Sequence, residues 1–135
     1  MIPHAGRMCL LDEVAQWNEA AIRCVSRSHR DRDNPLRAGA ELPALCGIEY
    51  AAQAMAVHGR LSAAVAETPR AGYIASVSDV VCRATRLDDL EQDLVIDAER
   101  LAGDRERVLY RFVLSAGGTE LLRGQAAVVL DAGRK

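Results

Sequence analysis

One carboxylate stands in a stretch that is otherwise small and apolar. Glu49 lies within residues 43–59, where alanine and other small or apolar residues predominate. Pro43 suits the first turn of a helix, the alanine-rich run has high helix propensity, and Gly59 suits a helix end. A helix that is apolar on most sides is buried, and a carboxylate in it costs free energy unless it is paired or takes part in chemistry. The stretch therefore predicts a buried helix with one carboxylate that is either paired or takes part in chemistry.

The nearest polar residue on the same helix face is Gln53, one turn after Glu49. Two interpretations are open on these residues alone. Glu49 sits at the rim of the core in a salt bridge with an arginine while Gln53 caps backbone, or the two polar side chains belong to a catalytic or binding site.

The histidines are the other titratable side chains to place relative to Glu49. His58 comes nine residues after Glu49. At about 100° per residue it falls on the opposite helix face, so we expect a helix-end residue that does not pair with Glu49. His29 opens a polar loop over residues 29–41. It either folds back toward the helix or is a solvated loop residue.

Composition excludes several functions. The 135 residues, half of them apolar, predict one domain over 1–135, and the net charge of −2 gives no case for nucleic acid binding. The apolar helix is too short and interrupted to span a membrane, and no apolar leader follows Met1, so we expect a cytoplasmic protein without a signal peptide. We expect no metal and no cofactor, because the cysteines lack metal-ligand spacing and resemble reduced core thiols. These cysteines are Cys9, Cys24, Cys46 and Cys82.

The elements that must position Glu49 follow from the alternation of apolar and polar residues. The helix, expected from Pro43 to about Ala64, follows two short strands and precedes several longer ones. Gly103-Asp104 and Gly117-Gly118 predict hairpin turns. The expected strands cover residues 14–17, 20–26, 72–83, 94–101, 107–116 and 120–130. One apolar helix among antiparallel strands predicts an α+β domain in which the sheet curls round the helix.

Three segments together carry a resemblance to a known family. They are Ile2–Val14 with its Pro-His pair, Pro43 with Gly47–Ala54, and the basic-then-acidic turn 83–94. In order and spacing they resemble the bacterial 3-hydroxyacyl-acyl-carrier-protein dehydratases. IEYAAQAMAVHG and ASVSDV bring the chain closest to the dehydratase-like proteins of aryl polyene gene clusters. The resemblance implies a hotdog fold, an antiparallel sheet wrapped around one long central helix, and a structural role for His4.

The resemblance also implies roles for individual residues. In the family, the helix acid protonates the departing hydroxyl, and Glu49 matches it. A loop histidine of the other subunit removes the proton beside the thioester carbonyl. Asn34 stands at or near that position here, and an amide cannot accept the proton, so His29 is the candidate replacement. Backbone amides near Ala44, where the family has glycine, are expected to polarise the carbonyl.

Substrate and partners follow from the same resemblance. The substrate is an acyl thioester on an acyl carrier protein or coenzyme A, with Gln53 and Ala44 in the binding site. Arg83 and Arg86 match basic residues that face the anionic carrier arm. The chain is expected to form a homodimer or a heterodimer with a second dehydratase subunit.

Three functions remain open from the sequence. The first is a 3-hydroxyacyl thioester dehydratase of fatty acid or polyene synthesis. The second is a hotdog thioesterase in which Asn34 and Glu49 hold and activate a water. The third is a non-catalytic subunit of a heteromeric dehydratase, favoured by the missing loop histidine.

Overall fold

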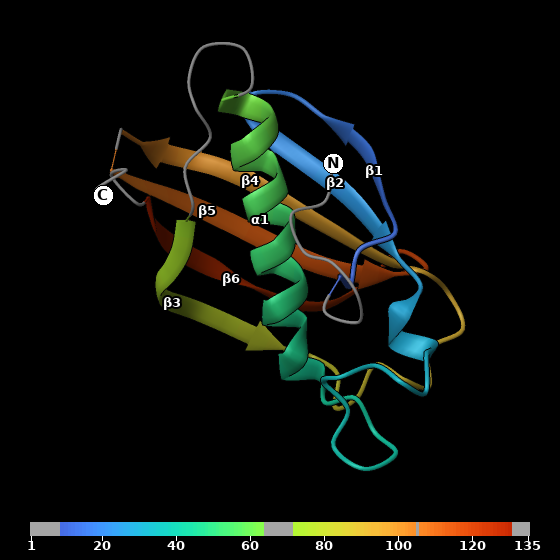
Figure 1. The fold of residues 1–135 in the computed structure, drawn as a ribbon. Coiled ribbons are helices and arrows are strands. Elements are labelled where there is room, and N and C mark those ends of the chain that lie inside the picture. The colour runs from blue at the N-terminus through green and yellow to red at the C-terminus, as the bar shows by residue number, and fades with distance from the viewer. Residues whose placement is uncertain (1–8, 64–71, 105, 131–135) are drawn as a thin grey trace.

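The fold is one antiparallel sheet with a single long helix lying across it (Figure 1). The computed structural model describes residues 9–63, 72–104 and 106–130. The strands follow the order β1-β2-β4-β5-β6-β3, so β1 and β3 form the two edges. The strand bounds are β1 Glu13–Trp17, β2 Ala21–Ser26, β3 Gly72–Cys82, β4 Leu94–Gly103, β5 Arg107–Ala116 and β6 Thr119–Leu130. The predicted α+β hotdog architecture is confirmed.

The central helix begins with one turn of 3-10 geometry. That turn, η3, covers Ala44–Cys46, and α1 continues it over Gly47–Ala63. Pro43 stands before the turn in an extended conformation, with ψ 143°. A Cβ atom at Gly47 would lie 2.7 Å from a methyl carbon of both Leu114 and Leu122. Glycine at this position therefore lets the start of α1 approach the sheet more closely than a larger residue could without shifting the two leucine side chains.

The two sides of α1 differ in burial. The side facing the sheet is fully covered, with Tyr50, Ala51, Ala54 and Val57 all at 0 % exposure. The opposite side is only half-buried in the single chain. It carries an apolar stripe of Leu45, which is 57 % exposed, and Ile48, Ala52 and Ala56, with Glu49 among them. The helix is thus buried on most sides, as expected, but not on all of them.

Irregularities in the edge strands change the side-chain alternation expected from the sequence. The pairing of β3 with β6 shifts register between Ile74 and Ser76 and again between Ser78 and Val81. Asp79 lies in the second irregularity with φ 54°, a left-handed conformation that aspartate tolerates better than most residues. The simple alternation predicted along 72–83 is therefore wrong near Asp79, because a bulge inserts an unpaired residue.

The hairpin prediction at the β5–β6 connection is confirmed. Ala116 pairs with Thr119, so Gly117 and Gly118 form a two-residue turn, with φ of 58° and 81°. Both positive φ values match the turn that continues the twist of a hairpin.

The cysteine prediction is partly wrong. All four thiols are free, but only Cys24 is fully buried, and Cys82 is exposed on the edge strand β3. Of the helices in the described residues, none combines the length and the apolar character needed to cross a bilayer.

Candidate functional site

Glu49 and Gln53 lie together at the start of the central helix. Glu49 is in the first turn of α1, where the helix dipole favours a negative charge, and its side chain is half-buried. The Gln53 side chain is fully buried and donates from Nε2 to Oε2 of Glu49 over 3.3 Å. The backbone N–H of Leu10 donates to Oε1 of Gln53 at 2.9 Å. The segment before β1 therefore fixes which end of the Gln53 amide faces Glu49.

Asn34 lies in the loop before η3 and is 6 % exposed. Its Nδ2 group donates to the backbone oxygen of Ser28 at 2.8 Å and to the hydroxyl of Tyr50 at 3.0 Å. Its Oδ1 accepts the N–H of Leu36 at 2.9 Å. Asn34 thus connects the loop to the helix residue next to Glu49, and both of its amide hydrogens have partners within the chain. Its role in holding a water stays a prediction.

His29 is fully buried, so the interpretation as a solvated loop residue is wrong. It lies in the short helix η2, Ser28–Arg30, and its Nε2 is 3.1 Å from the backbone oxygen of Leu90. A carbonyl only accepts, so Nε2 carries the hydrogen, and Nδ1 is left without a partner among the described residues. Burial lowers the pKa of His29, with the nearby charge of Arg30 as a further cause. The imidazole is therefore neutral and turned toward the Leu90 turn.

The sequence suggested that His58 lies at the helix end, but α1 continues to Ala63. His58 is fully buried, with Nε2 2.8 Å from the backbone oxygen of Asn18 and Nδ1 2.7 Å from the hydroxyl of Tyr110. The expectation that it stands apart from Glu49 agrees with these contacts, which lead to the β1–β2 turn and to β5. Burial lowers the pKa of His58. His4 lies outside the described residues.

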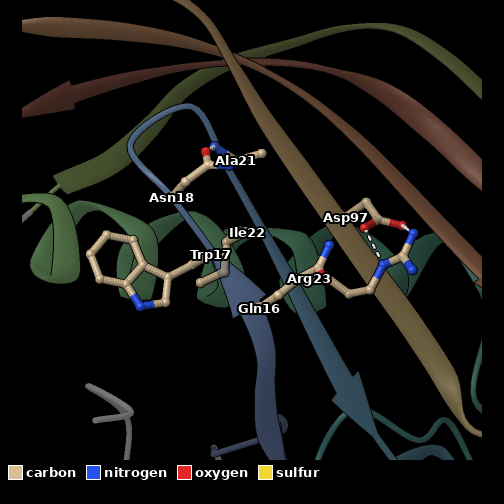
Figure 2. A pocket seen from close by; sticks show the side chains of 7 residues that line it. All are labelled: Gln16, Trp17, Asn18, Ala21, Ile22, Arg23 and Asp97. Carbon is tan, nitrogen blue, oxygen red and sulfur yellow. Dashed lines mark hydrogen bonds and ion pairs between the residues drawn. The ribbon is translucent and has the colours of Figure 1, made fainter.

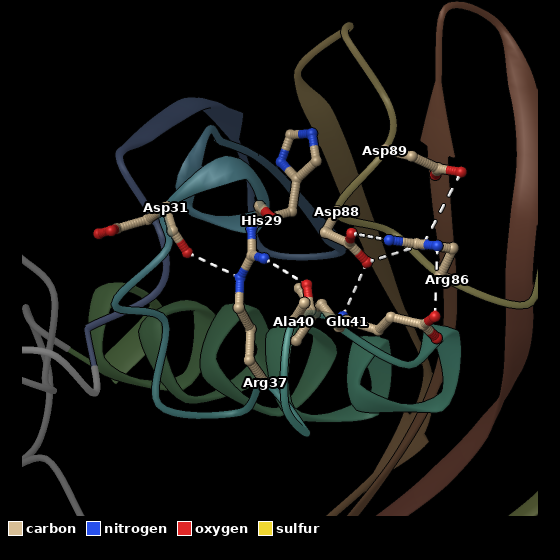
Figure 3. A network of polar contacts seen from close by, with 9 residues as sticks. His29, Asp31, Arg37, Ala40, Glu41, Arg86, Asp88 and Asp89 are labelled. Atoms are coloured by element: carbon tan, nitrogen blue, oxygen red, sulfur yellow. Dashed lines mark hydrogen bonds and ion pairs between the residues drawn. The ribbon is translucent and has the colours of Figure 1, made fainter.

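Arg86 belongs to an ion-pair network beside the helix start (Figure 3). It pairs with Asp88 and, at 3.3 Å, with Glu41. Asp88 also accepts the backbone N–H of Leu42 at 2.7 Å, so it fastens the segment before Pro43 to this turn. The Arg86 guanidinium lowers the pKa of Asp88 well below its ordinary value.

Arg83 and Ala44 have partners within the chain as well. Arg83 pairs with Glu120 at 3.0 Å. The N–H of Ala44 donates to the backbone oxygen of Thr85, and that of Cys46 to Pro43, both over 3.0 Å. Polarisation of a thioester carbonyl by these amides, and carrier binding by the two arginines, remain predictions.

A hollow of about 300 Å³ opens at the other end of the molecule, along the β1 edge (Figure 2). The half-exposed indole of Trp17 lies on one side of it, and the Arg23–Asp97 pair, 2.7 Å apart, on the other. It is lined by Gln16, Trp17, Asn18, Ala21, Ile22, Arg23 and Asp97. No candidate catalytic residue lines this hollow. Among the described residues, no group of histidine, cysteine or acidic side chains has the arrangement to hold a metal ion.

Sequence reasoning missed Tyr50 and Ser28. The Tyr50 hydroxyl is 2.8 Å from Oγ of Ser28, and Ser28 Oγ donates to the backbone oxygen of Leu10 at 2.8 Å. The sequence did contain a signal for Tyr50: it directly follows Glu49 in an alanine-rich helix that was predicted to be buried. A buried phenol requires a hydrogen-bond partner.

Comparison with known proteins decides the family. The model of the ApeP-like family, described as ApeP dehydratase, matches residues 1–132. The chain belongs to this dehydratase family. This family agrees with the resemblance to dehydratase-like proteins that the sequence motifs indicated. No curated protein matches the chain.

Solved structures agree on the fold. The dehydratase heterocomplex ApeI:P from Xenorhabdus doucetiae matches with a TM-score of 0.84 and 22 % identity, over 98 % of this chain and 89 % of that chain. A hypothetical thioesterase with coenzyme A from Streptococcus pneumoniae TIGR4 matches with a TM-score of 0.66 and 10 % identity, over 91 % and 88 % of the two chains. AziG from S. sahachiroi has the same TM-score and identity, over 87 % and 89 %. At these identities the likeness establishes the hotdog fold.

Proposed function

We propose that this chain is a 3-hydroxyacyl thioester dehydratase subunit in which Glu49 is the general acid. The observation that carries the proposal is the position of Glu49. It is the one carboxylate on the apolar, half-buried side of α1, and Gln53 holds it in place. Membership of the ApeP-like family supports the reaction class.

The reaction needs one proton taken and one given. A base removes a proton from C2 of the acyl chain, and that electron pair forms the C2–C3 double bond as the C3–O bond breaks. The Glu49 carboxyl gives its proton to the departing hydroxyl, so the products are an enoyl thioester, water, a Glu49 carboxylate and a protonated base. A positioned acid of this kind contributes about 10²–10⁴-fold to the rate.

The base comes from a second dehydratase subunit in this proposal. His29 and His58 are both buried, and the Nε2 of each is engaged with a backbone oxygen. The apolar stripe of Leu45, Ile48, Ala52 and Ala56 leaves one side of α1 incompletely covered, which suits a partner surface. The likeness to the ApeI:P dehydratase heterocomplex, which has the same fold, supports a partner of the dehydratase type.

The substrate in this proposal is an acyl chain carried as a thioester on acyl carrier protein. In this proposal the anionic carrier is attracted by Arg83 and Arg86, whose segment pairs with Pro43 at the helix start. Their acidic partners reduce the net attraction, so the carrier must compete with Glu120, Glu41 and Asp88.

The test is turnover of a medium-chain 3-hydroxyacyl carrier protein, with the enoyl product and free thiol measured separately. We expect enoyl product from the chain mixed with a second hotdog dehydratase subunit, and a loss of about 10²–10⁴-fold in Glu49→Gln. Free thiol without enoyl product, lost in Asn34→Ala, would replace the dehydratase by the thioesterase. Full activity of Glu49→Gln would reject Glu49 as the acid and leave the non-catalytic subunit as the function.

A further inference from the structure

A continuous series of hydrogen bonds connects the loop residue Asn34 to Glu49 through the interior. It passes through Tyr50, Ser28, the backbone of Leu10 and Gln53. Tyr50, Leu10 and Gln53 are at most 1 % exposed. Buried polar groups in such a series hold one another in a single arrangement.

The direction of each bond in the first half follows from its partners. Oδ1 of Asn34 accepts the N–H of Leu36, so its Nδ2 must donate to the Tyr50 oxygen. The single hydroxyl hydrogen of Tyr50 then goes to Oγ of Ser28, and that of Ser28 goes to the backbone oxygen of Leu10. The Ser26 hydroxyl joins this half as well: its Oγ donates to the same backbone oxygen of Leu10 and lies 2.9 Å from Oγ of Ser28.

The second half ends on one oxygen of Glu49. The N–H of Leu10 requires Oε1 of Gln53 as acceptor, so Nε2 of Gln53 is the end that donates to Oε2 of Glu49. The Glu49 carboxyl is therefore held through its Oε2.

We propose that Tyr50 is a positioning residue for the acid: through Ser28 and Leu10, its hydroxyl holds Gln53 so that Nε2 of Gln53 keeps the Glu49 carboxyl in one orientation. This inference rests on the proposed function, because it names what places the acid of that reaction. Tyr50 itself touches no reacting atom. It connects three parts of the chain to the first turn of α1, namely η2, the loop of Asn34 and the segment before β1.

Two variants each interrupt this series of hydrogen bonds. Tyr50→Phe removes the hydroxyl and keeps the ring, and Ser28→Ala breaks the next bond. We expect each to lower kcat for dehydration about tenfold at unchanged KM, within the usual coupling of a hydrogen-bond network. Tyr110→Phe is the matched control. It also removes a hydroxyl from a buried tyrosine, but that hydroxyl contacts His58, so kcat should stay unchanged.

A double-mutant cycle separates positioning from general loss of stability. If Tyr50 acts through Gln53, Tyr50→Phe combined with Gln53→Ala is no slower than Gln53→Ala alone. If the kcat losses of Tyr50→Phe and Gln53→Ala multiply in the double variant, the inference is overturned. An equal loss of kcat in Tyr110→Phe would also overturn it.

A readout independent of turnover keeps the inference separate from the proposed function. The side-chain amide of Gln53 in ¹⁵N-labelled protein should shift in Tyr50→Phe and in Ser28→Ala, and stay in place in Tyr110→Phe. An unchanged Gln53 signal in Tyr50→Phe would overturn the inference whatever the activity. Absence of dehydration in the wild-type chain with its partner would reject the proposed function instead.

Discussion

The hydroxyl of Tyr110 lies 2.7 Å from Nδ1 of His58, across 52 positions of sequence. Because Nε2 of His58 faces the backbone oxygen of Asn18, it carries the hydrogen, and Nδ1 accepts from the tyrosine. His58 is therefore held in its neutral form between β5 and the β1–β2 turn. Burial raises the pKa of Tyr110 to about 12, so the phenol keeps its hydrogen at neutral pH.

This relationship predicts acid sensitivity. The folded-state pKa of His58 is lowered, so the unfolded state binds more protons below about pH 6.5, the ordinary histidine value. The free energy of unfolding should be constant above that pH and fall as the pH drops further, by at most about 1.4 kcal/mol per pH unit for each such histidine. Urea unfolding from pH 7.5 to 5 measures it. His58→Gln should show a shallower slope, and equal slopes would contradict the prediction.

Two glycines of α1 should respond oppositely to alanine. A Cβ at Gly47 would overlap Leu114 and Leu122, so Gly47→Ala should cost about 1–3 kcal/mol of unfolding free energy. Gly59→Ala has nothing within 4 Å of the new carbon and should gain up to about 1 kcal/mol from helix propensity. Thermal or urea unfolding of both variants is the measurement. A tolerated Gly47→Ala would show that the helix start is less tightly packed.

His29 should prove structural. Its Nε2 is bound to Leu90 and its Nδ1 is enclosed, so we expect His29→Gln to keep dehydration within a few-fold of wild type. Rates are compared at equal folded fraction, checked by circular dichroism. A fall of about 10²–10⁴-fold would instead restore His29 as the catalytic base.

Charge reversal at the turn beside the helix start should weaken carrier binding. Arg83→Glu with Arg86→Glu is expected to reduce affinity for an acidic carrier protein about tenfold at low salt and less at high salt, because surface attraction is screened. Arg111→Glu, another half-exposed arginine with an acidic partner, Glu99 at 2.8 Å, is the matched control. Equal titration curves for the reversed pair and wild type would remove this face as the carrier site.

The fold was predictable because its signals are local. Alternation marked every strand to within a few residues, Gly117-Gly118 marked a hairpin, and the spacing of Glu49 and Gln53 placed both on one face. The bulge at Asp79 was not predictable, because side-chain alternation alone does not reveal where an edge strand inserts a residue.

The candidate site was only half accessible to sequence reasoning. Asn34 meets Tyr50 across 16 positions, and Leu10 meets Gln53 across 43. Such contacts depend on how the loop and the segment before β1 pack against the helix, which spacing along the chain does not encode. The burial of His29 has the same origin, because the turn around Leu90 covers it.

The position of Trp17 makes it an intrinsic fluorescent probe of subunit association. It is the only tryptophan in the sequence, it is 44 % exposed, and it belongs to β1, at the opposite edge of the sheet from β3. Its emission therefore reports on one edge alone. A subunit that joins at β3 should leave the spectrum almost unchanged, whereas one that covers β1 should shift the emission to the blue. Mixing this chain with a partner that lacks tryptophan is then enough to tell which edge is occupied.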